Sequence, residues 1–216
     1  MNINLIVPDL VNFNSFRYSA EVFAEWLAGK HDITISMRYK PEALNITIKD
    51  MVLAFRFLKK SDIAWLDTPL QMRRSYIFAY RNFKSRQFKE IYVTCEWNKR
   101  QLEEYDIKVD GVIPRLINPI AFTFYSTEKD KPLAMIGWHD APDRKNFKLA
   151  GQIMRETNIS IHAITNSNCV IKDYEFGRID EKTKFEWLSK AKYLLHIAFS
   201  GGFEIPCLEA MACGVL

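Results

Sequence analysis

The sequence predicts an α/β protein with two domains, each built around a parallel sheet. Short apolar segments alternate with amphipathic segments of helical length along most of the 216 residues. This pattern stops between residues 117 and 132 and then starts again. Because strands separated by helices of roughly 10–15 residues are joined by right-handed crossovers, each half is expected to form its own parallel sheet. We place the domains at residues 1–120 and 130–216.

The first half opens with an apolar strand and an amphipathic helix. Val22, Phe23, Trp26 and Leu27 share one face of that helix, and Gly29 ends it. The expected strands are 3–7, 32–37, 63–66, 90–94 and 111–114, and the expected helices are 19–27, a segment after Pro69, and 97–105.

The second half resumes the alternation after an interruption that contains two prolines and a charged run. Its expected strands are 133–137, 159–165 and 193–198, and its expected helices are 146–156, 180–191 and 206–213. The same alternation in both halves predicts the same kind of sheet in both.

The composition is that of an ordinary globular protein, with 48% hydrophobic and 26% charged residues. The net charge of +4 suits anionic partners without selecting one. The cysteines lack zinc-ligand spacing and a dense disulfide pattern, which favours a reducing, cytoplasmic location. No apolar run reaches the roughly 18–20 residues of a membrane span. An Asp-x-Asp pair, a P-loop and a Gly-x-Gly-x-x-Gly motif are also absent from the sequence. We expect neither a metal nor a cofactor.

The strongest chemical signal lies in residues 199–214, where an apolar strand runs into a glycine pair, a proline and a helix. Gly201 and Gly202 let the backbone approach a ligand closely. The N–H groups at the helix N-terminus, starting with that of Phe203, suit anionic or hydroxyl oxygens. Glu209, about one turn inside the helix, can reach the same crevice. The alternative is a strand–turn–helix with an ordinary, partly buried glutamate.

This stretch resembles the Glu-x7-Glu segment of family-four retaining glycosyltransferases, which have the two-domain GT-B fold. The usual form in that family is Glu-Gly-Phe-Gly-Leu-Pro, two or three further residues, and Glu-Ala-Met-Ala-Cys-Gly. The matching positions are Gly202, Phe203, Pro206, Leu208 and the run from Glu209 to Gly214. Two positions depart from the pattern: Gly201 stands where the family has its first glutamate, and Glu204 stands where it has its second glycine.

The resemblance implies a role for each position of the motif. Glu209 matches the second glutamate of the family, which binds the ribose hydroxyls of the donor nucleotide. Gly201, Gly202 and Phe203 would also line the donor site. The first glutamate contacts the transferred sugar in the family, and Glu204 is the candidate to substitute for it in a catalytic role.

A second match lies at the start of the second domain, where residues 134–137 and 142–146 are similar to the strand, glycine and Arg-Lys-Asn segment of the family. A departing nucleoside diphosphate gathers negative charge, which GT-B enzymes meet with basic side chains and helix N-termini rather than with a metal. The resemblance makes Lys145 the first phosphate ligand and Arg144 the second. A solvated basic loop is the alternative.

The first half carries a weaker resemblance over residues 62–69 and 91–114, which are similar to parts of the acceptor domain of the family. Asp67 follows an expected strand, at the carboxyl end where ligands of α/β sheets bind, and is a candidate catalytic contact to the acceptor. A helix-capping role is the alternative for this aspartate.

Residues 73–89 hold six basic residues and no acidic one. An amphipathic helix with a solvated basic flank is one interpretation. A surface for anionic membrane lipid or for a charged acceptor is another. Aromatic residues interleaved with arginine also fit single-stranded nucleic acid, although we do not expect nucleic acid as a partner.

Together these features predict a metal-independent glycosyltransferase with two Rossmann-like domains and its active site in the cleft between them. It would move a sugar, with retention, from a nucleoside-diphosphate sugar to a hydroxyl of a glycan, lipid or protein. A catalytically impaired nucleotide-sugar-binding protein of the same fold is the alternative, which Gly201 favours. A GT-B-fold epimerase is a second alternative, against which the Glu-Ala-Met-Ala-Cys-Gly run argues.

The family normally continues well beyond the position of Gly214, so the resemblance implies a donor domain truncated at its C-terminus. A sheet without its covering helices exposes apolar faces and open edges. We therefore expect self-association, most simply as a two-fold dimer.

Overall fold

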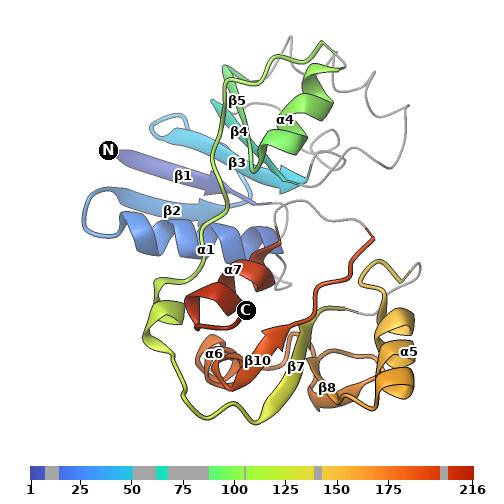
Figure 1. Cartoon of the computed structure of the whole chain (residues 1–216). Coiled ribbons are helices and arrows are strands. Elements are labelled where there is room, and N and C mark those ends of the chain that lie inside the picture. The colour runs from blue at the N-terminus through green and yellow to red at the C-terminus, as the bar shows by residue number, and fades with distance from the viewer. Residues whose placement is uncertain (8–14, 51–61, 68–87, 105, 139–142, 200–203) are drawn as a thin grey trace. The chain divides into compact units, whose positions relative to one another are not determined.

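The computed structural model describes residues 1–7, 15–50, 62–67, 88–104, 106–138, 143–199 and 204–216. The chain divides into two compact units, Met1–Leu116 and Ile117–Leu216. Each unit contains one sheet, and all strand pairs in both sheets are parallel (Figure 1). This confirms the predicted α/β class with parallel sheets.

The sheet of the first unit has six strands in the order β2-β1-β3-β4-β5-β6. Its elements are β1 (Asn2–Ile6), α1 (Ser15–Leu27), β2 (Asp32–Ser36), β3 (Leu44–Asp50), β4 (Ile63–Asp67), β5 (Glu90–Val93), α4 (Glu96–Glu103) and β6 (Gly111–Val112). In the part of the chain that the structure describes, no helix is both long enough and apolar enough to cross a bilayer.

Strand β4 shows how helices cover both faces of this sheet. Successive side chains of a strand point to opposite faces. Trp65 packs with residues of α1, and its ring centroid lies 5.6 Å from that of Phe23. Ala64 and Leu66 belong to a second buried cluster, which includes Leu102 of α4. The sheet is therefore a central layer between α1 and α4, as a parallel sheet requires.

A buried polar network joins β1, β2 and β3. Asn4 Nδ2 donates to Asn45 Oδ1 at 2.8 Å, and Ser36 Oγ donates to Asn4 Oδ1 at 2.8 Å. Asn45 Nδ2 also donates to the carbonyl oxygens of Lys40 and Ala43, each at 2.8 Å. Both asparagines are fully buried, and these bonds offset the free-energy cost of removing their amides from water.

The sheet of the second unit has four strands in the order β10-β7-β8-β9. Its elements are the 3₁₀ helix η1 (Pro119–Thr123), β7 (Lys131–Ile136), α5 (Phe147–Thr157), β8 (Ile161–Ile164), β9 (Ile171–Tyr174), α6 (Glu181–Ser189), β10 (Ala191–Leu194) and α7 (Ile205–Ala212). Met135 of β7 packs with Phe147 and Ala150 of α5 in one buried cluster. Figure 1 shows α5 on one side of this sheet and α6 and α7 on the other.

Two strands were not predicted, and β7 and β10 each begin two residues earlier than expected. Strand β3 alternates apolar and polar residues from Leu44 to Ile48, and its polar residues Asn45 and Thr47 are buried as well. Strand β9 lies at the sheet edge with all of its residues exposed, so it has no apolar pattern to find. Strand β10 was expected at 193–198 but begins at Ala191. Ala191 is fully buried, but the lysines on both sides of it made this position look solvent-exposed in the sequence.

Gly151 lies where α5 packs most closely against the loop after β8. A Cβ atom added to this buried glycine would lie 2.9 Å from the carbonyl oxygen of Cys169. Gly151→Ala should therefore lower the free energy of unfolding by about 1–2 kcal/mol through overpacking, although alanine is otherwise the better helix former by about 1 kcal/mol. Urea denaturation measures the change, with Gln152→Ala on the exposed side of α5 as the control. A stabilised Gly151→Ala variant would contradict the close packing.

Candidate functional site

The candidate site lies at the carboxyl edge of the second sheet, where the strand order reverses. The chain runs from β7 to β8 and β9 in one direction and then returns to place β10 on the other side of β7. In open parallel sheets, ligands bind outside the carboxyl ends of the strands at such a reversal. The described parts of the loops that flank it are residues 137–138 and 143–146 after β7 and residues 195–199 and 204 after β10, and they include the expected site residues Arg144, Lys145 and Glu204.

These two loops are in direct contact. The backbone N–H of Phe199 donates to the carbonyl oxygen of Arg144 at 2.9 Å. Lys145 Nζ lies 2.6 Å from Glu204 Oε2, although the residues are 59 positions apart in the sequence. Their side chains are 26% and 19% exposed, so the pair is partly shielded from solvent. The structure thus joins the expected phosphate ligand and the expected substitute for the first glutamate.

The position of Lys145 is fixed by its neighbours in the loop. A Cβ atom added to Gly137 would lie 3.0 Å from Lys145 Cγ, so the lysine stem runs against the backbone at the end of β7. Asp143 caps α5, because its two carboxylate oxygens each accept a backbone N–H at 2.9 Å, from Phe147 and Lys148. Arg144, between the cap and Lys145, is exposed. The cap therefore holds both expected phosphate ligands immediately before a helix.

The pKa of Cys207, in the first turns of α7, depends on both members of the Lys145–Glu204 ion pair. Burial raises the pKa of its thiol above the ordinary value, and the negative charge of Glu204 raises it further. The positive charge of Lys145 acts in the opposite direction. The half-buried thiol therefore lies within the field of both charged groups.

Glu209 lies on α7 and is paired with a lysine of α6. Lys184 Nζ lies 2.8 Å from Glu209 Oε1 and 2.7 Å from Glu181 Oε1. The side chain of Glu209 is only 3% exposed and that of Lys184 is 13% exposed. A carboxylate removed from water to this extent requires a cation close by. The Glu181–Lys184–Glu209 triad therefore fixes α6 against α7 and carries a net charge of −1.

Lys184 is the main residue of this region that the sequence did not identify. The sequence places it in an expected helix, but its partner Glu209 lies 25 residues further on. A sequence signal for Lys184 does exist. The residue lies in helix α6 between Glu181 and the buried Phe185, and this helix packs on the sheet. A lysine at such a position needs a carboxylate from another element.

The remaining expected site residues are Gly201, Gly202, Phe203 and Asp67. Gly201, Gly202 and Phe203 lie outside the described residues, as does segment 73–87 of the basic stretch. Asp67 is the last residue of β4 in the first unit, and its backbone is in register with that of Asp50 at the carboxyl end of β3. The catalytic role expected for Asp67 therefore stays a prediction.

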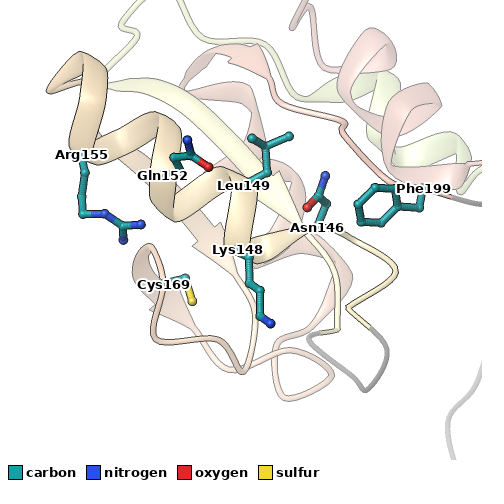
Figure 2. Close-up of a pocket in the computed structure, with 7 residues that line it drawn as sticks. All are labelled: Asn146, Lys148, Leu149, Gln152, Arg155, Cys169 and Phe199. Atoms are coloured by element: carbon teal, nitrogen blue, oxygen red, sulfur yellow. The ribbon is translucent and has the colours of Figure 1, made fainter.

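A cavity of about 570 Å³ lies beside α5 (Figure 2). The described residues that line it are Asn146, Lys148, Leu149, Gln152, Arg155, Cys169 and Phe199. Neither ion pair contributes a residue to this described lining. Two basic side chains at the cavity suit an anionic ligand, but the reversal of strand order places the chemistry of the sheet edge at Lys145 and Glu204.

The arrangement combines a positioned ammonium group, the Glu204 carboxylate and the N-terminus of α7, whereas Glu209 pairs separately with Lys184. Glu204 is the residue at the N-terminal boundary of α7, and Pro206 occupies its first turn. Pro206 has no N–H and the Cys207 N–H donates to the Glu204 carbonyl oxygen at 3.3 Å, so the helix end contributes the positive end of its dipole next to the charge of Lys145. The site can therefore hold a phosphate group if Glu204 gives up its contact with Lys145.

Comparison with known proteins gives three relatives, whereas no family model matches the sequence. The chain is 29% identical over 177 residues to "Putative glycosyltransferase 41" of Sulfolobus islandicus filamentous virus (isolate Iceland/Hveragerdi), covering 80% of this chain and 51% of the relative. It is 26% identical to "Putative glycosyltransferase 48" of the same virus, covering 86% of this chain and 60% of the relative. It is also 26% identical to "Putative glycosyltransferase 63" of that virus, covering 85% and 64%. The chain therefore spans between 51% and 64% of the length of these curated relatives.

Proposed function

We propose that this chain is a glycosyltransferase of the GT-B type whose second unit binds a nucleoside-diphosphate sugar. The observation that carries the proposal is the contact between Lys145 and Glu204 at the point where the strand order reverses. The similarity to three viral proteins named as glycosyltransferases supports sugar transfer as the activity. The parallel sheets of both units fit a Rossmann-like architecture.

In the proposed reaction, the bond between the anomeric carbon and the diphosphate oxygen breaks, and the acceptor hydroxyl oxygen bonds to that carbon with retention. The proton of the acceptor hydroxyl passes to a phosphate oxygen of the leaving diphosphate. Lys145, Arg144 and the positive end of the α7 dipole would offset the charge that develops on the leaving group, without a metal. Glu204 would then lie free beside the transferred sugar.

Glu209 would accept hydrogen bonds from the ribose hydroxyls in this proposal. Its side chain is 3% exposed in the ligand-free chain and is engaged by Lys184. A ribose contact therefore requires an oxygen of this carboxylate to become accessible as the donor binds. Glu209→Ala is a poor probe of that contact, because it would also leave the buried Lys184 without this carboxylate.

A catalytically impaired sugar-nucleotide-binding protein is the second candidate function. The observation that favours it is the pairing of Glu204 with Lys145, because a carboxylate held by the phosphate ligand does not face a sugar. The replacement of the first glutamate by Gly201 favours it as well. Both candidates share the diphosphate site and differ in turnover alone.

The diphosphate site is tested with Lys145→Ala. This variant should bind a nucleoside diphosphate about tenfold more weakly than the natural chain, because a charge-assisted hydrogen bond contributes roughly 1.5–3 kcal/mol. Binding of the uncharged nucleoside should not change. Calorimetry in the presence of EDTA measures both, with the exposed Lys182→Ala as the matched control.

Equal weakening of nucleoside and diphosphate would make Lys145 a structural residue, and loss of binding in EDTA would count against the metal-independent reaction. Hydrolysis of a panel of sugar nucleotides separates the two candidate functions. Release of sugar supports the transferase, whereas tight binding without release supports the binding protein.

A further inference from the structure

Two aromatic side chains meet at the same edge of the second sheet as the candidate site. Trp138 follows Gly137 directly after β7, and Phe176 lies in the loop after β9. Their ring centroids are 5.7 Å apart and their planes are almost perpendicular, at 86°. Edge-to-face packing of this kind holds two rings in a defined orientation.

The geometry of the pair leaves aromatic surface uncovered. In an edge-to-face contact, one ring presents its edge to one face of the other, so further faces stay free of the partner ring. Trp138 is 52% exposed, which is high for the largest apolar side chain. Phe176 therefore supports the indole without burying it.

Gly137 connects this aromatic pair to the proposed phosphate ligand. The stem of Lys145 packs closely against Gly137, because a Cβ added to this glycine would lie 3.0 Å from Lys145 Cγ. Trp138, with its exposed indole, is therefore the next residue after Gly137, against which Lys145 packs. A ligand with an aromatic group near an anionic group matches this combination.

We propose that Trp138, supported by Phe176, stacks on the nucleobase of the ligand whose phosphates contact Lys145. This inference rests on the proposed function, which supplies a nucleoside diphosphate as the ligand class. Stacking of a base on an aromatic side chain tolerates any base, because every base has a π-face. The pair would therefore strengthen binding of the nucleotide without selecting the base.

The experiment compares ADP, GDP, UDP and CDP with inorganic pyrophosphate, which has the diphosphate charge but no base. Trp138→Leu should weaken binding of all four nucleotides about tenfold, within the range that base–aromatic stacking supplies. Its affinity for pyrophosphate should equal that of the natural chain, which also shows that the variant site is folded. Trp138→Phe should recover most of the nucleotide affinity. Trp97→Leu is the control, because Trp97 is another exposed tryptophan in the other unit.

Unchanged nucleotide affinity in Trp138→Leu would overturn the inference and leave the proposed function standing. Equal weakening of nucleotides and pyrophosphate would overturn it too, because Trp138 would then support the Lys145 turn. UDP-glucose is titrated in parallel, and weakening confined to it, with free UDP unaffected, would overturn the inference by assigning the indole to the sugar instead of the base. If the natural chain binds neither the nucleotides nor pyrophosphate, both the inference and the proposed function fail.

Discussion

Lys184→Met should lower the free energy of unfolding by about 3 kcal/mol, the lower end of the range for removing one partner of a buried ion pair. The substitution keeps the length and apolar stem of the side chain but removes the ammonium group that both Glu181 and Glu209 contact. The side chain of Glu209 is only 3% exposed, and its carboxylate would no longer contact the ammonium group of Lys184. Urea denaturation followed by circular dichroism measures the change.

Two further variants separate the charge effect from a general effect of altering α6. Lys182→Met changes an exposed lysine of the same helix and should leave the free energy of unfolding within about 0.5 kcal/mol. Adding Glu209→Gln to Lys184→Met also removes the negative charge of Glu209 and should recover part of the lost stability. If Lys184→Met is as stable as Lys182→Met, the triad does not hold α6 and α7 together.

Lys145→Glu should weaken binding of a nucleoside diphosphate by about 100-fold or more. The variant loses the charge-assisted hydrogen bond, and it places a carboxylate against the incoming phosphates at a position where like charges cost several kcal/mol. Glu204→Gln should act in the opposite direction and strengthen binding about fivefold, because Lys145 no longer has to leave an ionised partner. Calorimetry with ADP and UDP measures both shifts, and the exposed Lys182→Glu is the control for the change in net charge.

Alkylation of Cys207 checks that this ion pair exists in solution without ligand. Glu204 raises the pKa of the Cys207 thiol, so Glu204→Gln should lower the pKa and speed alkylation near pH 8. Lys145→Glu should slow alkylation of Cys207, because a cation that favours the thiolate is replaced by an anion.

In the calorimetry, weaker nucleotide binding by Glu204→Gln would show that Glu204 takes part in binding instead of competing for Lys145.

The sequence predicted the fold class because apolar periodicity is a local property. Helix α7 was expected at 206–213 and occurs at Ile205–Ala212, since proline and glycine signals mark both of its ends. Strand β3 was not predicted, and the contacts that stabilise its buried Asn45 include a residue far away in the sequence. Its buried Asn45 is satisfied by Asn4, Lys40 and Ala43, and such a network is invisible until the strands are paired.

The candidate site shows the same division between local and distant information. Lys145, Glu204 and Glu209 could be named from the motifs in which they occur. Their partners could not, because the contacts of Lys145 with Glu204 and of Lys184 with Glu209 depend on how loops and helices are packed at the sheet edge. The aromatic pair of Trp138 and Phe176 likewise joins loops that follow different strands.

The contact between Lys145 and Glu204 also bears on which anions can occupy the proposed site. Any anion that binds Lys145 has to displace the carboxylate of Glu204. Because Glu204 belongs to the same chain, its local concentration next to Lys145 is fixed and high. A small anion such as free phosphate gains only the lysine in exchange and would compete poorly. In the proposed function, a nucleoside diphosphate that also reached Trp138 and the N-terminus of α7 would gain further contacts in this exchange. Glu204 would thereby set a selectivity threshold against a small anion such as free phosphate.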